Sequence, residues 1–229
     1  MKKTAIITGV AGNLGKAVAK KFVDEGYSVI GTIHGQSEND NFPKNSFEEK
    51  KVDLLNEESC KQFIKEVIEK YGKIDVAVLT AGGFASGNLA STKSADIYQQ
   101  YQLNFETAFN IARPVFIQMM QQNSGHIFLI GSRPGLNPSK AKDTIAYSLS
   151  KSLIFRLAEM LNAEAKGKDV VTSVIVPSVI NTPQNRESMP NADFSSWVKP
   201  EEIADTIFFY SSEIANAVRE PVIKIYNRS

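Results

Sequence analysis

Short runs rich in valine and isoleucine alternate with longer amphipathic segments along the whole chain. Buried parallel strands have apolar runs of this kind, whereas apolar residues three or four positions apart indicate a helix with one buried face. Leu14, Val18 and Phe22 show the helical spacing. The pattern predicts strands at 4–8, 28–33, 50–53, 75–80, 126–131, 170–176 and 221–226, and helices at 14–25, 57–71, 95–121, 144–165 and 200–212.

Most predicted strands are followed by a predicted helix, and the connections are short. Because crossovers between parallel strands are right-handed, few topologies fit this order. The simplest is an α/β fold of the Rossmann type. It has a single domain spanning 1–229, with a doubly wound parallel sheet of about seven strands and helices on both faces. Ligands of such sheets bind at the carboxyl ends of the strands, where the polar stretches 35–46 and 181–196 lie.

Composition excludes several classes of protein. The chain carries 26 Lys and Arg against 25 Asp and Glu, a net charge of +1. This balance gives no basic surface for nucleic acid or for an anionic membrane. No apolar run approaches the roughly 18 residues needed to cross a bilayer. Cys60 is the only cysteine, which excludes an internal disulfide and the usual zinc clusters. We therefore expect no metal and a reducing, cytoplasmic location.

A glycine-rich turn, Thr-Gly-Val-Ala-Gly-Asn-Leu-Gly at 8–15, joins the first predicted strand to the first predicted helix. One glycine allows the tight turn, the second lets the backbone approach a phosphate, and the third permits close packing of the helix on the strand. The N–H groups that begin the helix attract the anion. Three glycines also suit a purely structural turn. The nucleotide-binding interpretation involves Gly9, Gly12, Asn13, Leu14 and Gly15.

The end of the second strand should meet the adenosine ribose, where an acid favours NAD and a basic residue favours NADP. The chain has neither an acid nor an arginine there, but Thr32, His34 and Ser37 could donate hydrogen bonds to a 2′-phosphate. We therefore favour NADP slightly, although His34 as a solvated loop residue is an equally good interpretation. Asp53, at the end of the third predicted strand, is a candidate acceptor for the adenine amino group or else a capping residue.

Tyr147 and Lys151 lie four residues apart and therefore share one face of a predicted helix. A neighbouring ammonium lowers the pKa of a phenol, which would suit Tyr147 to act as a general acid. Such a pair also arises by chance, so its surroundings must support it. Ser132 follows the fifth predicted strand, Asn104 lies in the preceding helix, and 80–83 ends the fourth strand with two glycines. Ser132 and 80–83 should adjoin the same pocket.

The order of these residues resembles the short-chain dehydrogenases/reductases over essentially the whole chain. The set falls in the family's order at about its spacing: the turn at 8–15, Asp53, Ala81, Gly82, Asn104, Ser132, Tyr147 and Lys151. Two positions depart from the family. Asn13 replaces the usual middle glycine of the turn, and Ser178 replaces the usual glycine after Pro177. These departures concern loop details more than cofactor binding.

The resemblance implies an enzyme that transfers hydride between NAD(P) and a small carbonyl or alcohol substrate. Tyr147 would exchange the proton and Ser132 would polarise the carbonyl. Lys151 would also hold the nicotinamide ribose, and Asn104 would support a water relay. The further cofactor-binding positions that the resemblance implies are Ala81, Gly82, Pro177, Ile180 and Thr182, the last on the nicotinamide carboxamide.

The segment 181–197, which contains the only tryptophan, more narrowly resembles the corresponding stretch of quinonoid dihydropteridine reductase. It would form a lid in which Arg186, Met189 and Trp197 contact the substrate. Arg186 could equally form a rim salt bridge, and Trp197 could anchor the segment on the body of the protein. The resemblance to that reductase implies use of NADH, and that reductase has no serine at the position of Ser132. Pterin reduction is therefore the alternative, and a general carbonyl reductase is favoured.

A hypothesis of another class is a protein that binds NAD(P) as a sensor and interacts with partners without turnover. The presence of all four tetrad residues argues against it, because a sensor does not need a tyrosine–lysine pair. For the enzyme, family analogy implies a homodimer or homotetramer.

Overall fold

A seven-stranded parallel sheet in the order β3-β2-β1-β4-β5-β6-β7 forms the centre of the computed structural model, which describes residues 2–35, 42–43 and 45–228. The strands are β1 (Thr4–Thr8), β2 (Ser28–Ile33), β3 (Phe47–Lys51), β4 (Val76–Leu79), β5 (Ser124–Ile130), β6 (Asp169–Pro177) and β7 (Val222–Ile225). β1 pairs with both β2 and β4, so the strand order reverses there. The predicted doubly wound sheet is confirmed, and its ligand crevice is expected at this reversal.

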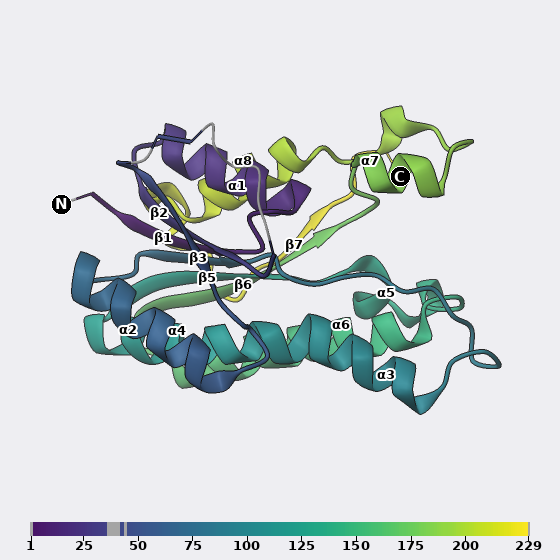
Figure 1. Ribbon diagram of the computed structural model, residues 1–229, viewed down its shortest axis with the longest axis horizontal. Helices are drawn as coiled ribbons and strands as arrows, with labels where there is room; N and C mark the ends of the chain where they lie inside the picture. The colour runs from purple at the N-terminus through teal and green to yellow at the C-terminus, as the bar shows by residue number, and fades with distance from the viewer. Residues whose placement is uncertain (1, 36–41, 44, 229) are drawn as a thin grey trace.

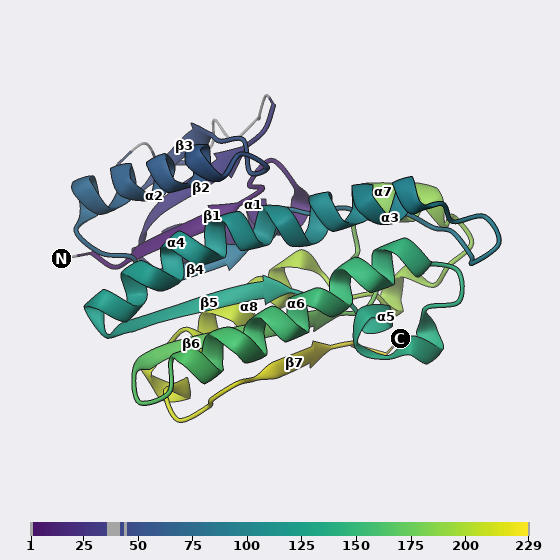
Figure 2. The same cartoon turned by 90° about the horizontal axis from the view of Figure 1, so that it is seen from below.

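Helices cover both faces of the sheet (Figure 1). α1 (Asn13–Asp24) and α8 (Pro200–Tyr210) pack together on one face. On the other face lie α2 (Glu57–Tyr71), α3 (Ser94–Tyr101), α4 (Thr107–Gln122) and α6 (Ile145–Glu164), as Figure 2 shows from below. Successive strand residues face opposite layers, so that Phe128 and Leu129 belong to two different buried clusters. Burial on both faces explains why the strands are almost continuously apolar.

The helix predicted at 95–121 is divided by a π-helical turn, η1 (Gln102–Glu106), between α3 and α4. Inserting one residue into the helical repeat changes which side chains face inward, and such turns are frequent at functional sites. Here the turn contains Asn104, whose side chain is buried. The apolar periodicity of the segment continues across the turn, which is why the sequence pattern did not reveal it.

The third strand was wrongly placed. β3 spans Phe47–Lys51 and not 50–53, so Asp53 lies two residues beyond its end. The strand pairs with β2 only, and its sequence Phe-Glu-Glu-Lys-Lys leaves both lysines exposed. Edge strands carry charged side chains of this kind, and an apolar run is therefore a poor guide to them.

Short helical segments in the loops were also missed. Ser132 caps α5 (Arg133–Leu136) and Thr182 caps α7 (Pro183–Ser188), each accepting a hydrogen bond from a backbone N–H three residues on. Three 3₁₀ turns complete the loops: η2 (Pro138–Lys140), η3 (Phe194–Ser196) and η4 (Glu213–Ala215). Both capped helices begin at the carboxyl edge of the sheet, where the candidate site residues lie.

The described residues contain neither a candidate membrane span nor a candidate metal-binding cluster. None of their helices has the length and apolarity that crossing a bilayer requires. Nor do their His, Cys, Asp and Glu side chains form a group of three or more that could hold a metal ion.

Candidate active site

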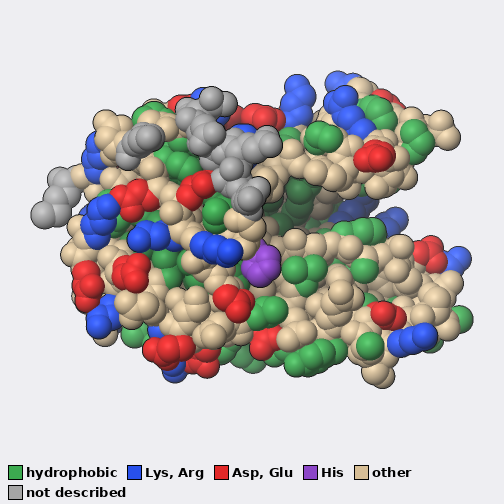
Figure 3. All heavy atoms as spheres, viewed as in Figure 1, with side chains coloured by type: hydrophobic (Ala, Val, Ile, Leu, Met, Phe, Trp, Pro, Cys, Tyr) green, Lys and Arg blue, Asp and Glu red, His purple; other side chains and the backbone are tan. Residues whose placement is uncertain are grey.

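The carboxyl ends of the strands open onto a hollow between α7 on one side and the helices α3 and α5 on the other (Figure 3). The glycine-rich turn after β1 and the ends of β4 and β5 approach this hollow from the sheet. The candidate residues therefore come together from distant parts of the chain, as a doubly wound sheet requires.

The turn after β1 forms a close-packed cradle. Gly9 has φ +70°, a conformation that favours glycine. A Cβ on Gly15 would lie 2.3 Å from the Gly9 carbonyl oxygen and 2.8 Å from Thr80 Oγ1. α1 begins at Asn13, and no side chain in the described part of the chain caps its first turn. N–H groups left open at a helix N-terminus bind phosphate, so the turn fits a dinucleotide.

Asn13 connects this turn to the segment 181–197. Its Nδ2 donates a hydrogen bond of 2.9 Å to Oε1 of Gln184, in the first turn of α7. The family glycine that Asn13 replaces has no side chain with which to make this contact. Leu14 is partly buried against the core on the α1 side of the sheet.

The end of β2 buries one of its candidate residues and leaves another exposed. Thr32 is buried, and its carbonyl and hydroxyl oxygens both face the Gly9 N–H, at 3.0 and 3.4 Å. Its burial and this contact give Thr32 a structural role at the turn, and a bond from it to a 2′-phosphate stays a prediction. His34 is exposed just beyond the strand, whereas Ser37 lies outside the described residues.

Asp53 is exposed and holds a turn. Its Oδ1 accepts a hydrogen bond of 3.0 Å from the Leu55 N–H, while Asn56 caps α2. Asp53 therefore stabilises the turn that precedes α2, while the N-cap of that helix is Asn56, three residues later. The second carboxylate oxygen is not engaged by this bond.

Ser132, Tyr147 and Lys151 meet at the end of β5. The Ser132 side chain is 4% exposed, accepts a hydrogen bond of 3.1 Å from Gly135 N and is hydrogen-bonded with Tyr147. One turn along α6, Lys151 is 5% exposed, and its Nζ donates a hydrogen bond of 2.8 Å to the Ile130 carbonyl. The last residue of β5 thus fixes the ammonium, one helical turn along α6 from Tyr147.

Asn104 brings the end of β4 to the same place. It is 1% exposed, accepts a hydrogen bond of 3.0 Å from Gly83 N, and donates one of 3.1 Å to Gln100. A Cβ on Gly82 would lie 2.7 Å from Asn104 Oδ1 and 3.5 Å from Lys151 Nζ. The segment containing Ala81 and Gly82 therefore packs directly against the buried asparagine and lysine.

The pKa values differ from what the tyrosine–lysine spacing suggested. Burial raises the pKa of Tyr147 above its usual 10.0, and the hydrogen bond with Ser132 opposes this only in part. Burial also lowers the pKa of Lys151 to about 8. The lysine does not lower the pKa of the phenol here because its ammonium is directed to the Ile130 carbonyl.

The segment beyond β6 supplies the other predicted residues. Pro177 ends β6, and Ile180 pairs with Val198 in an isolated bridge. The Thr182 hydroxyl accepts a hydrogen bond of 3.2 Å from Asn185 N as the cap of α7. Thr182 therefore has a structural role that leaves its own hydroxyl proton available.

Three residues were predicted to contact substrate, and of these Arg186 and Met189 are exposed, Met189 to 38%. Trp197 is 5% exposed, with its ring 4.8 Å from that of Phe194, so the anchoring interpretation replaces substrate contact. Arg186 donates a hydrogen bond of 2.7 Å to Asn181 and lies over the Phe194 ring. It lines a cavity beside α1 whose described lining contains no tetrad residue, so substrate contact by Arg186 stays a prediction.

Phe84 was missed by the sequence reasoning. It is 66% exposed, and its ring stands edge-on to that of Tyr147, with centroids 5.1 Å apart. The available signal was a large apolar residue directly after Ala81-Gly82-Gly83, the turn that ends β4.

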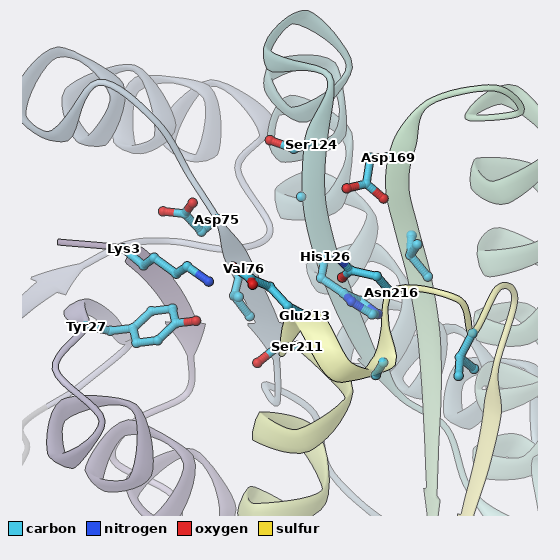
Figure 4. Close-up of a pocket in the computed structure, with 14 residues that line it drawn as sticks. Lys3, Tyr27, Asp75, Val76, Ser124, His126, Asp169, Ser211, Glu213 and Asn216 are labelled. Carbon is cyan, nitrogen blue, oxygen red and sulfur yellow. The ribbon is translucent and has the colours of Figure 1, made fainter. Parts of the chain in front are cut away.

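A separate cavity of about 230 Å³ lies at the opposite, amino ends of the strands (Figure 4). Three of its ionisable groups are engaged locally: Asp75 accepts from Thr4 N, His126 bonds Ser173, and Asp169 pairs with Arg219. Burial lowers the pKa of His126 to about 3, so this ring is neutral at pH 7. The cavity is far from the candidate site along every strand, and we assign it a structural role.

Comparison with known proteins agrees with the fold and with the family that the sequence resembles. Residues 3–193 match the short chain dehydrogenase family. The 3-oxoacyl-(acyl-carrier-protein) reductase FabG of Buchnera aphidicola subsp. Acyrthosiphon pisum is 28% identical over 229 residues, covering 95% of this chain and 93% of the relative. An acetoacetyl-CoA reductase of Acinetobacter sp. is 28% identical over 190 residues, covering 80% and 76%.

Among solved structures, ElxO with NADP bound superposes with a TM-score of 0.90 at 24% identity, covering 98% of this chain and 97% of ElxO. At this identity the likeness concerns the fold. The sequence match is what assigns the family: the chain belongs to the short chain dehydrogenases and is an oxidoreductase.

The buried ammonium makes stability depend on pH. The pKa of Lys151 is about 8 in the folded chain and 10.5 ordinarily, so the unfolded chain binds this proton more tightly. As the pH falls from 10.5 to about 8, wild type should lose up to roughly 3 kcal/mol of stability. Lys151→Met abolishes this titration. Urea unfolding of both proteins should show wild type losing stability relative to the variant between about pH 10 and pH 7.

Lys151→Met also loses the hydrogen bond to the Ile130 carbonyl. The stability lost with that bond is the same at each pH and therefore does not affect the change with pH. Lys142→Met, at an exposed lysine, is the control and should leave the pH dependence unchanged. A stability difference between wild type and Lys151→Met that is the same at both pH values would contradict the buried ammonium.

Proposed function

We propose that the protein reduces a small ketone or aldehyde with NADPH, using Tyr147 as the proton donor, and catalyses the reverse oxidation of the alcohol. The observation that carries this proposal is the convergence of Ser132, Tyr147, Lys151 and Asn104 beside Gly82, at the strand ends next to the phosphate cradle. A hydrogen-bonded hydroxyl pair next to a buried cation suits proton transfer to a carbonyl oxygen.

The choice of NADP over NAD rests on two observations. No carboxylate stands at position 34, where it would repel a 2′-phosphate. Among structures with the same fold, ElxO was solved with NADP and a tyrosine-to-phenylalanine variant of it with NADPH. The pyrophosphate would be held by the start of α1 and by the turn that contains Gly9, Gly12 and Gly15. A Cβ on Gly15 would collide with this turn, which brings the start of α1 against the end of β1. Gly82 and Thr182 would lie along the nicotinamide end.

NADPH, when bound, would supply the hydride that the carbonyl carbon accepts. Ser132 and Tyr147 bind the carbonyl oxygen through their hydroxyl groups, and the Tyr147 proton moves to that oxygen as the alcohol forms. The raised pKa keeps Tyr147 protonated until then. Lys151, one helical turn away, would hold the nicotinamide ribose, and the hydrogen bond with Ser132 favours the phenolate that remains. Proton donation by a positioned side chain contributes about 10²–10⁴-fold.

The segment 181–197 is proposed as a lid over this site. Met189 is its exposed apolar residue, while Trp197 fixes the segment to the body of the protein. The hydrogen bond between Asn13 and Gln184 keeps the start of the lid next to the phosphate cradle. Closure of such a segment excludes water from the reacting groups.

The protein is also proposed to form a homodimer or homotetramer. The helical stretch of α3, η1 and α4 packs beside α6 on one face of the sheet (Figure 2). Large apolar side chains are exposed along these helices: Leu103, Phe109, Ile117, Leu149, Leu153 and Met160. An exposed apolar set of this size on two neighbouring helices is typical of a protein–protein interface.

Tyr147→Phe should lower kcat/KM for carbonyl reduction by about 10²–10⁴-fold, because it removes only the proton donor. NADPH affinity, measured by fluorescence titration, should remain that of wild type. The panel should include ethyl pyruvate, aryl ketones and quinonoid dihydropterin. Tyr210→Phe, on α8, is the matched control. Undiminished turnover by Tyr147→Phe would remove Tyr147 from the proposed chemistry, and tight cofactor binding without any turnover would favour the sensor.

His34→Asp should weaken NADPH binding by about tenfold relative to NADH, because a carboxylate there repels the 2′-phosphate. Fluorescence titration with both nucleotides measures this change directly. His34→Asn, which adds no charge, should change the preference much less. A wild-type protein that prefers NADH would overturn the role given to His34.

Ile117→Lys should dissociate the proposed oligomer, because it places a charge in the apolar face of α4. Sedimentation velocity should report a smaller particle than wild type. Phe209→Lys, at a side chain exposed to 49% on the opposite layer against 47% for Ile117, is the control. A monomeric wild type would refute the assembly.

A further inference from the structure

Phe84 combines exposure with contact to the candidate proton donor. Its side chain is 66% exposed, while its ring lies 5.1 Å from that of Tyr147 at an interplanar angle of 68°. Edge-to-face contact of this kind occupies only part of an aromatic surface. The remaining surface of Phe84 is therefore open to a ligand whose reacting oxygen is held at Tyr147.

The chain holds Phe84 in this position from both sides. Before it, Gly83 N donates to Oδ1 of the buried Asn104 at 3.0 Å. After it, Gly87 N donates to the Asp143 carbonyl at 2.8 Å, and the Gly87 carbonyl accepts from Ile145 N at 3.0 Å. The second pair of bonds joins the loop to the residues that begin α6, which carries Tyr147. The start of α6 thus positions both the loop and the phenol. The backbone on either side of Phe84 is held by hydrogen bonds, which keeps this residue next to Tyr147.

Exposure alone does not distinguish Phe84. Leu89, further along the same loop, is 79% exposed. However, the Phe84 ring is in edge-to-face contact with that of Tyr147, a tetrad residue. Binding sites for small molecules are lined mainly by apolar and aromatic side chains around a few polar groups, and Phe84 beside Tyr147 and Ser132 provides this combination.

We propose that Phe84 determines substrate specificity by packing against an aromatic or extended apolar group bonded to the carbonyl. The preferred substrates are then ketones or aldehydes that carry such a group, and short or polar carbonyl compounds are poor substrates. This inference rests on the proposed reduction at Tyr147. Contact between aromatic groups and burial of apolar area both favour the larger substrate.

Two keto esters with the same reacting carbonyl test the proposal: ethyl 2-oxo-4-phenylbutanoate and ethyl pyruvate. Wild type should prefer the phenyl ester by kcat/KM, and Phe84→Ala should lower the ratio of the two values by about tenfold. Phe84→Leu, which keeps apolar bulk without a ring, should fall between them. Leu89→Ala, in the same loop, should leave the ratio unchanged. An unchanged ratio would exclude any role of Phe84 in specificity. If kcat/KM falls equally on both esters, Phe84 only supports Tyr147.

Binding separates this inference from the proposed chemistry. Calorimetry should measure the affinity of the NADP⁺ complex, which cannot donate a hydride, for acetophenone, with wild type and Phe84→Ala compared. The variant should bind several-fold more weakly. If wild type reduces neither ester, the proposed reaction fails, yet weaker binding by Phe84→Ala still supports the apolar subsite. Equal affinity of the two proteins overturns the subsite whether or not the reaction occurs.

Discussion

The hydrogen bond from Lys151 Nζ to the Ile130 carbonyl is the contact on which the geometry of the site depends. It ties α6 to the end of β5, two residues before Ser132. Because Tyr147 lies one helical turn from Lys151, fixing the ammonium also places the phenol beside the Ser132 hydroxyl. A buried ammonium reduces stability, and burial is what lowers its pKa to about 8. The site therefore combines precise placement with a local cost in stability.

The cofactor end of the molecule uses backbone groups instead of charged side chains. The close approach of Gly15 to the Gly9 carbonyl brings the start of α1 against the end of β1 and leaves its first N–H groups open. A few oriented amides at a helix N-terminus are sufficient to bind phosphate. This arrangement is consistent with a chain whose net charge is only +1. Asn13 adds a side-chain contact to α7 that a glycine at this position lacks.

The sequence predicted best what repeats along the chain. β1, β2 and α2 have the predicted bounds because their apolar patterns are determined by burial. β3 was misplaced because it is a charged edge strand, and the π-helical turn around Asn104 was invisible because the helical periodicity continues through it. Residue order predicted the tetrad, but the orientation of Trp197 and of Phe84 depends on tertiary packing that no local pattern specifies.

The most direct test of the central claim is a crystal structure of the complex with NADPH. We expect the pyrophosphate on the N–H groups that begin α1, the 2′-phosphate near His34, and the nicotinamide ring next to the Tyr147 hydroxyl and Lys151. Ser132 and Tyr147 should keep their hydrogen bond or share a solvent molecule between them. A nucleotide bound elsewhere, or a nicotinamide ring turned away from Tyr147, would contradict the account.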